Sequence, residues 1–566
     1  MNKKIAHVVL ALPVEGPFDY SIPEELQGKV SLGARVLILF SGKKCVGYIV
    51  GLVNRSSILK LNPVLELLDE EPVFSEAFLK FSTQFALYFG CSQGEALELF
   101  LPAYLRKPRI FEYERKGEMS IEVKDQGLSL GHSASRTSFS RQLIFDHGLT
   151  KQWDLLLPRI QETLVKGRGV VCLIPDGSFA GNVLPKLSTL VSPEQFVVIH
   201  KGTEKEEFGR WLKIRNGTAR LVVGCISAVF SPVQNLGLVV ILDEENHFYK
   251  HDQSPFYHAR EAAFLRQPCE GADVICVSSA PSVEVWHAVA EKKDQLCVLE
   301  DVLPAVKLLD LTNFKMKKET AISSGLAQHM EKTLQAHKTV FLYVPAARGT
   351  SDVVREAAQR FPGVDVASYE KTASGVPTTC DILVATQAVF RHRASLRFHL
   401  SAIVDIDWEF HKNDYRAAHG AFALVQHVRQ MTTGLVLLQT RNIHNGHLHM
   451  FAANDYEKFY RQELHHRRDM GLPPYNVLVA LVLRSEDPAL ACVEAKKLYD
   501  VLNEKRHETI GVLEPQQDRS AIVRGKFRYC VMVHGLEIKE IAGFVKEALR
   551  SFRRKKDVVI TINVNP

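Results

Sequence analysis

Three consecutive carboxylates, Asp243, Glu244 and Glu245, follow the apolar run 238–242. The run has the length and composition of a buried strand, and parallel α/β sheets place ligands at the carboxyl ends of their strands. In a nucleotide-hydrolysing protein, the first carboxylate would hold Mg²⁺ and the second would orient the attacking water. The same residues could instead cap the next helix, so the motif alone leaves both interpretations open.

Two segments combine aromatic residues with cations, a composition suited to stacking bases and neutralising phosphates. The first segment follows the carboxylates, and its candidate DNA contacts are Phe248, Tyr249, Lys250, Tyr257 and Arg260. The second lies near the carboxyl end, and its candidates are Arg524, Lys526, Phe527 and Arg528. A packed loop and a solvated charged face explain these segments about as well, so DNA binding is one of two interpretations.

The composition permits an anionic partner and excludes several classes of protein. The 566 residues are 46% hydrophobic and 24% charged, which excludes a disordered tail, a collagen and a coiled-coil rod. The net charge is +6, and residues 511–566 carry 11 Lys and Arg against 6 Asp and Glu, a local surplus of five. A basic end of this kind is either a polyanion contact or a solvated helix face.

Cysteine usage and the apolar runs predict a location in the cytoplasm. None of the ten cysteines forms a C-x-x-C pair, which favours free thiols in a reducing compartment over disulfides or a zinc site. The longest strongly apolar run, 236–242, is too short to cross a bilayer, so no membrane segment is expected. The apolar text at 5–13 superficially imitates a signal peptide, and we predict a strand there.

Apolar periodicity divides the chain into five segments of a multidomain α/β protein. Residues 1–105 predict a small β-barrel, and the polar stretch 106–140 predicts a linker or a reduced small domain. Short buried strands alternate with helices in 141–305 and again in 306–450, which predicts two parallel α/β lobes with a cleft between them. Residues 451–566 begin with a charged helix and predict a small α+β domain.

Short motifs recur in an order that resembles superfamily 2 helicases and, in detail, the primosomal protein N′ (PriA) family of replication-restart helicases. The matching text runs almost end to end and includes Gly16-Pro17-Phe18-Asp19-Tyr20, Asn235-Leu236-Gly237-Leu238, Tyr257-His258-Ala259-Arg260, Asp414-Tyr415-Arg416-Ala417-Ala418, Gly471-x-Pro473-Pro474-Tyr475 and Arg524-Gly525-Lys526-Phe527-Arg528-Tyr529. The resemblance implies RecA-like lobes, an amino-terminal barrel that binds 3′ DNA ends, a linker or reduced winged-helix remnant at 106–140 and a DNA-binding terminal domain.

The resemblance also assigns contacts and partners. The implied contacts with a 3′ end are Phe18, Asp19, Tyr20, Gly33 and Arg35. An aromatic face stacks a base, a carboxylate accepts a hydrogen bond from a terminal hydroxyl, and glycine permits close approach. The implied partners are branched or single-stranded DNA, single-strand-binding protein, and primosome or helicase-loader proteins.

The nucleotide motifs depart from the family pattern. The family's phosphate loop should read Gly-Ser-Gly-Lys-Thr, because glycine N–H groups surround phosphate oxygens, the lysine neutralises them and the hydroxyl holds Mg²⁺. Here the degenerate loop consists of His147, Gly148, Thr150 and Lys151, and the side chains of Trp153 and Asp154 are expected where phosphates would sit. The family's arginine-finger segment is replaced by residues 427–433, and its eight zinc-binding cysteines are missing.

These departures predict a DNA-binding scaffold without ATPase activity, in which Asp243 and Glu244 are retained but inactive. No cofactor is expected: the ATP and Mg²⁺ sites are degenerate, and zinc and other metal sites are absent. The alternative is an active ATP-dependent 3′-to-5′ DNA helicase of the primosome with atypical motifs.

Overall fold

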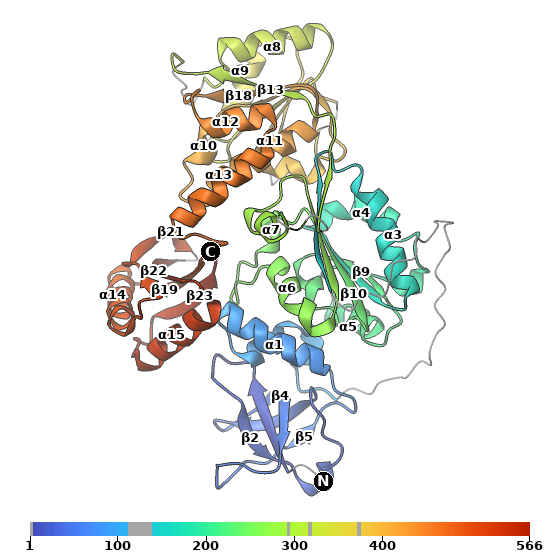
Figure 1. The fold of residues 1–566 in the computed structure, drawn as a ribbon, viewed down its shortest axis with the longest axis vertical. Coiled ribbons are helices and arrows are strands. Elements are labelled where there is room, and N and C mark those ends of the chain that lie inside the picture. Colours follow the sequence, from blue (N-terminus) through green and yellow to red (C-terminus); the bar gives the residue numbers. More distant parts are fainter. Residues whose placement is uncertain are drawn as a thin grey trace.

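The amino-terminal region forms a five-stranded antiparallel sheet with strand order β2-β1-β4-β3-β5 (Figure 1). Its strands are β1 (Ile5–Leu10), β2 (Phe18–Ser21), β3 (Arg35–Phe40), β4 (Lys43–Val53) and β5 (Glu66–Leu67), and the helices α1 (Glu76–Phe89) and α2 (Gln93–Leu99) follow. Ser21 exchanges backbone hydrogen bonds with residues 62 and 64, so the strand at one edge, β2, is joined to the segment that leads into β5. The sheet therefore curls toward the closed shape predicted for residues 1–105.

The computed structural model describes residues 4–110, 139–290, 292, 295–314, 320–370, 375–377, 379–523 and 525–566. The predicted contact Arg524 and most of the predicted linker 106–140 lie outside these residues. Among the described residues, no helix combines the length and the apolarity needed to cross a bilayer.

The first lobe is a seven-stranded parallel sheet with order β12-β6-β11-β10-β7-β9-β8. Its strands are β6 (Arg141–Asp146), β7 (Gly169–Leu173), β8 (Phe196–Ile199), β9 (Leu221–Gly224), β10 (Leu236–Leu242), β11 (Asp273–Ser278) and β12 (Leu296–Leu299). Its helices are α3 (Gln152–Val165), α4 (Ala180–Leu187), α5 (Glu204–Arg215), α6 (Ala259–Glu270) and α7 (Val283–Val289). Every residue of β10 is buried, as a central parallel strand covered on both faces requires.

The second lobe is a six-stranded parallel sheet with order β13-β18-β17-β14-β16-β15. Its strands are β13 (Ala305–Asp310), β14 (Val340–Tyr343), β15 (Val366–Tyr369), β16 (Ile382–Ala385), β17 (Phe398–Ile403) and β18 (Thr432–Thr440). Its helices are α8 (Ser324–Gln335), α9 (Ser351–Arg360), α10 (Asp407–Phe410), α11 (Ala417–Gln430) and α12 (Gly446–Ala453). The two RecA-like lobes that the sequence predicts are therefore confirmed as the fold class.

The carboxyl-terminal region is an α+β unit linked to the second lobe by the long charged helix α13 (Tyr456–Asp469), as Figure 1 shows. Its antiparallel strands are β19 (Val477–Ser485), β20 (Ile510–Val512), β21 (Gln516–Val523), β22 (Lys526–Gly535) and β23 (Val559–Val564), and its helices are α14 (Pro488–Lys505) and α15 (Ile538–Ser551). Helix α15 also contacts α1, so the carboxyl-terminal region packs against the amino-terminal region. The predicted domain boundaries stay predictions, because sheets locate cores and not borders.

Candidate nucleotide and DNA sites

The loop between β6 and α3 surrounds a carboxylate of the chain itself. Asp146 is fully buried at the end of β6. Its Oδ1 accepts the backbone N–H of Gly148 at 3.2 Å, and its Oδ2 accepts those of Lys151 at 2.8 Å and Gln152 at 2.7 Å. Backbone N–H groups at a helix start are the donors that bind phosphate in nucleotide loops. An internal carboxylate therefore occupies the donors that a triphosphate would need.

The other predicted loop residues face the end of β12. Lys151 Nζ donates to the carbonyl of Glu300 at 2.6 Å, and Thr150 Oγ1 lies 3.4 Å from Asp301 Oδ2. A Cβ at Gly148 would come within 2.2 Å of that same Asp301 oxygen. His147 is buried, which lowers the pKa of its imidazole. The four residues predicted as a phosphate loop thus lie together, but their contacts are internal.

Trp153 and Asp154 do not take the place of the phosphates, contrary to the sequence expectation. Trp153 is only 9% exposed and packs with Leu156 and Ile160 in the apolar core of the first lobe. Asp154 is exposed on the first turn of α3. The carboxylate inside the loop is Asp146, which the sequence reasoning passed over as the last residue of a strand.

Asp243, the predicted Mg²⁺ ligand, is paired across the interface between the lobes. It is 5% exposed and forms an ion pair with Arg393, which caps the short helix after β16 in the second lobe. Burial raises the pKa of the Asp243 carboxyl, and the charge of Arg393 opposes that rise. The Asp243 carboxylate is thus already neutralised by Arg393, which a bound metal ion would have to displace.

The two following carboxylates are also satisfied by protein groups. Glu244 is fully buried, and it accepts from Arg260 Nη1 at 2.8 Å and from the backbone N–H of Ser282 at 2.6 Å. Glu245 accepts from Ser278 Oγ at 2.6 Å and lies 3.4 Å from His427 Nε2 of the second lobe. Burial lowers the pKa of His427 to about 3, so this contact involves a neutral imidazole near neutral pH.

These contacts do not fit a bound ATP·Mg²⁺. The loop donors serve Asp146, the first catalytic carboxylate serves Arg393, and the second serves Arg260 and Ser282. Among the described residues, no group of three or more His, Cys, Asp or Glu side chains has a metal-binding arrangement. The residues predicted as a nucleotide site follow two strands of one sheet, β6 and β10, and their contacts lie within the loop or between the lobes.

The predicted 3′-end residues divide into a partly exposed group and a buried group. On the exposed side, Asp19 lies opposite His7 in the β1–β2 register, with Oδ1 3.4 Å from His7 Nε2, and it also accepts from the hydroxyl of Ser56. Phe18 is half-buried, with its ring 5.1 Å from that of Phe40. An aromatic face beside a carboxylate is suited to binding the 3′ end of a DNA strand. His7 and Ser56 are members of this group that sequence reasoning missed.

Arg35, Tyr20 and Gly33 belong to the framework of this region. Arg35 is fully buried, pairs with Asp69 and donates to the carbonyl of Leu105 at 2.5 Å. Tyr20 is 3% exposed and donates to the carbonyl of Leu39 at 3.1 Å. Gly33 has φ of +82° and touches the backbone of Phe74, where a Cβ would lie 2.1 Å from the carbonyl oxygen. None of these three residues presents a free group to the 3′ end of a DNA strand.

The aromatic segment after the carboxylates is mostly a packed loop. Tyr249 is fully buried and donates to the carbonyl of Leu242 at 2.7 Å. Tyr257 is also buried, with its ring 5.7 Å from that of Phe85 on α1. Phe248 keeps partial exposure beneath the guanidinium of Arg391, 4.9 Å from its ring. With Arg260 bound to Glu244, the packed alternative describes Tyr249, Tyr257 and Arg260.

Lys250, the remaining cation of that loop, donates to the carbonyl of Val564 on β23 at 2.8 Å. Burial lowers the pKa of Lys250 from 10.5 to about 7. The unfolded chain therefore binds more protons than the folded chain between these two values, and stability rises with pH across that window.

We expect the melting temperature to rise less steeply between about pH 7 and pH 8.5 in Lys250→Met than in the parent chain, because the variant lacks this proton uptake on unfolding. Differential scanning fluorimetry across that range measures the slopes. Lys458→Met, at an exposed position of α13, is the matched control. Parallel curves for parent and Lys250→Met would contradict the buried placement of this amine.

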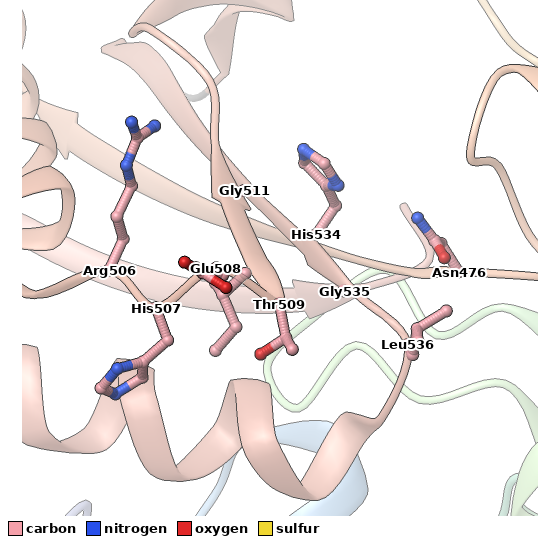
Figure 2. Close-up of a pocket in the computed structure, with 10 residues that line it drawn as sticks. Asn476, Arg506, His507, Glu508, Thr509, Gly511, His534, Gly535 and Leu536 are labelled. Atoms are coloured by element: carbon pink, nitrogen blue, oxygen red, sulfur yellow. The ribbon is translucent and has the colours of Figure 1, made fainter.

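The terminal candidates Lys526, Phe527 and Arg528 lie on β22 and are partly exposed. Arg528 Nη2 is 2.6 Å from Asp518 Oδ2, so its charge is already compensated. A cavity of about 580 Å³ lies at the β20 edge of the same region, and Figure 2 shows Arg506 and His534 around it. It is formed by a different part of the chain from the loop at Asp146.

Two facing RecA-like lobes with carboxylates at the strand ends, flanked by an amino-terminal antiparallel domain, define a helicase-like protein. Residues 7–102 match the family model of the PriA 3′ DNA-binding domain. Similar curated proteins include replication restart protein PriA of Bacillus subtilis (25% identity, over 74% of this chain and 63% of that protein), of Treponema pallidum (23%, over 99% and 98%) and of Rickettsia conorii (21%, over 94% and 94%). The chain belongs to the PriA family.

Similar solved structures include RecG bound to a three-way DNA junction, with 14% identity, a TM-score of 0.39 and coverage of 58% of this chain and 44% of that one. The helicase MrfA bound to DNA is another, with 11% identity, a TM-score of 0.36 and coverage of 56% and 46%. The match to the Bacillus subtilis relative spans less than two thirds of that protein's length.

Proposed function

We propose that this chain binds branched or single-stranded DNA during replication restart, as a scaffold that does not hydrolyse ATP. The observation that carries the proposal is the carboxylate of Asp146, which accepts three hydrogen bonds from the loop where a triphosphate would bind. Phosphate and carboxylate are both anions, so they exclude each other from one set of N–H donors. The interlobe pair of Asp243 and Arg393 supports the same conclusion.

The DNA-binding half of the proposal rests on the amino-terminal region. The match to a 3′ DNA-binding domain covers residues 7–102, which include Phe18 and Asp19. In this proposal Asp19 accepts a hydrogen bond from a terminal 3′ hydroxyl and Phe18 stacks on the last base, and the partial exposure of both side chains supports it. In the cytoplasm, single-strand-binding protein and primosome or helicase-loader proteins are the proposed protein partners.

Asp19→Ala is expected to abolish most of the preference for a fork with a free 3′ hydroxyl over one with a 3′ phosphate. A hydrogen bond to a charged group contributes about 1.5–3 kcal/mol, so the parent chain should prefer the hydroxyl fork by roughly tenfold or more. The carboxylate also repels a terminal phosphate. Fluorescence anisotropy with the two forks measures the ratio of dissociation constants.

The matched control for that experiment is Glu25→Ala, which removes an exposed carboxylate from the same region. Glu25→Ala should keep the parent's ratio. Equal ratios in the parent chain and in Asp19→Ala would remove the end-binding assignment, whatever the total affinity for DNA.

A further inference from the structure

One face of helix α15 carries an unassigned row of cations. Its apolar side chains Ile541, Phe544, Val545 and Ala548 are buried. Lys539, Lys546 and Arg550 lie on the opposite face at i, i+7 and i+11, and all three are exposed. We call these three residues the α15 basic row.

The flanks of the row add positive charge, and the nearby cations outnumber the nearby acidic residues Glu537, Glu540, Glu547 and Asp557. The exposed segment 553–556 consists of Arg, Arg, Lys and Lys and continues the row beyond the end of the helix. Glu547 lies beside the row, but its carboxylate is 3.3 Å from Lys505 Nζ of α14. At about 1.5 Å per residue, the row from Lys539 to Arg550 extends roughly 16 Å, enough to meet several phosphates of a DNA backbone.

A carboxylate from the other end of the chain already lies on this row. Glu15 Oε1 is 2.9 Å from Lys546 Nζ, and the second Glu15 oxygen forms an ion pair with Arg550. Glu15 precedes Gly16-Pro17 and the candidate end-binding residues Phe18 and Asp19. Two cations of the terminal region therefore lie next to the loop that leads into the candidate 3′-end site.

These ion pairs are weak enough to be exchanged. The side chains of Glu15, Lys546 and Arg550 are 46%, 55% and 65% exposed, and ion pairs in that setting contribute little net free energy. A DNA phosphate offers the same charge as the carboxylate, and its binding also releases condensed counterions. DNA can thus replace Glu15 on Lys546 and Arg550 without breaking a buried contact.

We propose that the α15 basic row binds backbone phosphates of the DNA strand whose 3′ end lies at Phe18 and Asp19, and that Glu15 occupies Lys546 and Arg550 when DNA is absent. This inference rests on the proposed DNA-binding function and adds the route that the DNA backbone follows. The strand end is held by the amino-terminal region, and the backbone leading away from it is held by the carboxyl-terminal helix.

The test uses the full chain carrying the double substitution Lys546→Ala/Arg550→Ala and a fork with a free 3′ hydroxyl. The slope of log affinity against log salt should become shallower by about 2, because two phosphate contacts are lost. The preference for a 3′ hydroxyl over a 3′ phosphate should stay at the parent value. A control double variant at exposed lysines elsewhere, Lys332→Ala/Lys496→Ala, should keep the parent's salt slope.

Glu15→Gln should change the fork affinity in the opposite direction. Removing the competing carboxylate should raise the fork affinity by up to about fivefold, and this gain should vanish in the Lys546→Ala/Arg550→Ala background. An unchanged salt slope in the double variant, in a chain that still selects the 3′ hydroxyl, would overturn this inference alone and point to an acidic protein partner for the row. A parent chain that does not bind forks would overturn the proposed function and this inference with it.

Discussion

Fork-stimulated ATP hydrolysis by the full chain is expected to stay at background, at least about 10³-fold below an active enzyme of this type. Loss of a single arginine finger lowers the rate of phosphoryl transfer by roughly 10³–10⁵, and here the finger segment is replaced as well as the loop. In the structure, Asp146 holds the loop donors and Asp243 is paired with Arg393. A coupled steady-state assay with forked DNA and Mg²⁺ measures the turnover.

Nucleotide binding gives an independent readout of the same expectation. A ligand at 100 times its dissociation constant stabilises a folded protein by about 2.7 kcal/mol, so ATP·Mg²⁺ bound to the lobes would raise the melting temperature visibly. We expect no such shift. Turnover that disappears in Asp243→Ala but persists in Glu331→Ala, an exposed carboxylate on α8, would instead establish the helicase alternative.

The lobes could be predicted because their strands are short, apolar and buried on both faces. Residues 238–242 were expected as a strand, and β10 spans Leu236–Leu242 with every residue buried. The charged helix before Gly471 was likewise expected, and α13 ends at Asp469. Such elements follow from local composition, so one sequence is enough to find them.

The occupant of the phosphate loop could not be predicted in the same way. The hydrogen bonds to Asp146 depend on the path of the loop, in which Leu149 adopts a φ of +54°. Positive φ is uncommon for residues other than glycine, so nothing in the text His147-Gly148-Leu149 indicates that backbone conformation. The sequence did indicate an acidic substitute for phosphate, but it indicated Asp154, eight residues after Asp146.

The burial of the aromatic loop could not be predicted for a different reason. Tyr249 and Tyr257 have the spacing of a base-stacking loop, but the same residues are also suited to a core. Packing against α1 favours the core interpretation, because Phe85 of that helix contacts Tyr257 although the two residues are distant in the sequence. Burial of this kind depends on long-range packing, and one sequence does not show it.

Two of the carboxylates that resemble a catalytic site also contact the second lobe. Asp243 and Glu245 each meet a group of the second lobe, Arg393 and His427. Where an ATP-driven protein alternates between lobe arrangements, a buried pair such as Asp243–Arg393 favours one arrangement, because separating it leaves a charge unpaired. A scaffold that presents a fixed DNA surface is consistent with that constraint.

Arg35→Ala is expected to give the largest loss of stability of the variants considered. Its guanidinium is fully buried, pairs with Asp69 and donates to the carbonyls of Leu105 and Arg109. Truncation leaves the carboxylate of Asp69 buried without its partner, which costs about 3–5 kcal/mol. Arg35→Lys should not restore the loss, because an ammonium cannot donate in so many directions at once.

Because the chain has several domains, the effect is best measured locally and not as one unfolding transition. Hydrogen exchange of the amides in β3 and β4 should accelerate in Arg35→Ala, while exchange in the second lobe should stay at the parent rate. Arg55→Ala, an exposed arginine of the same region, should change stability by no more than about 0.5 kcal/mol. If Arg35→Ala instead kept native exchange in β3 and lost only fork affinity, Arg35 would be a DNA contact and not part of the framework of this region.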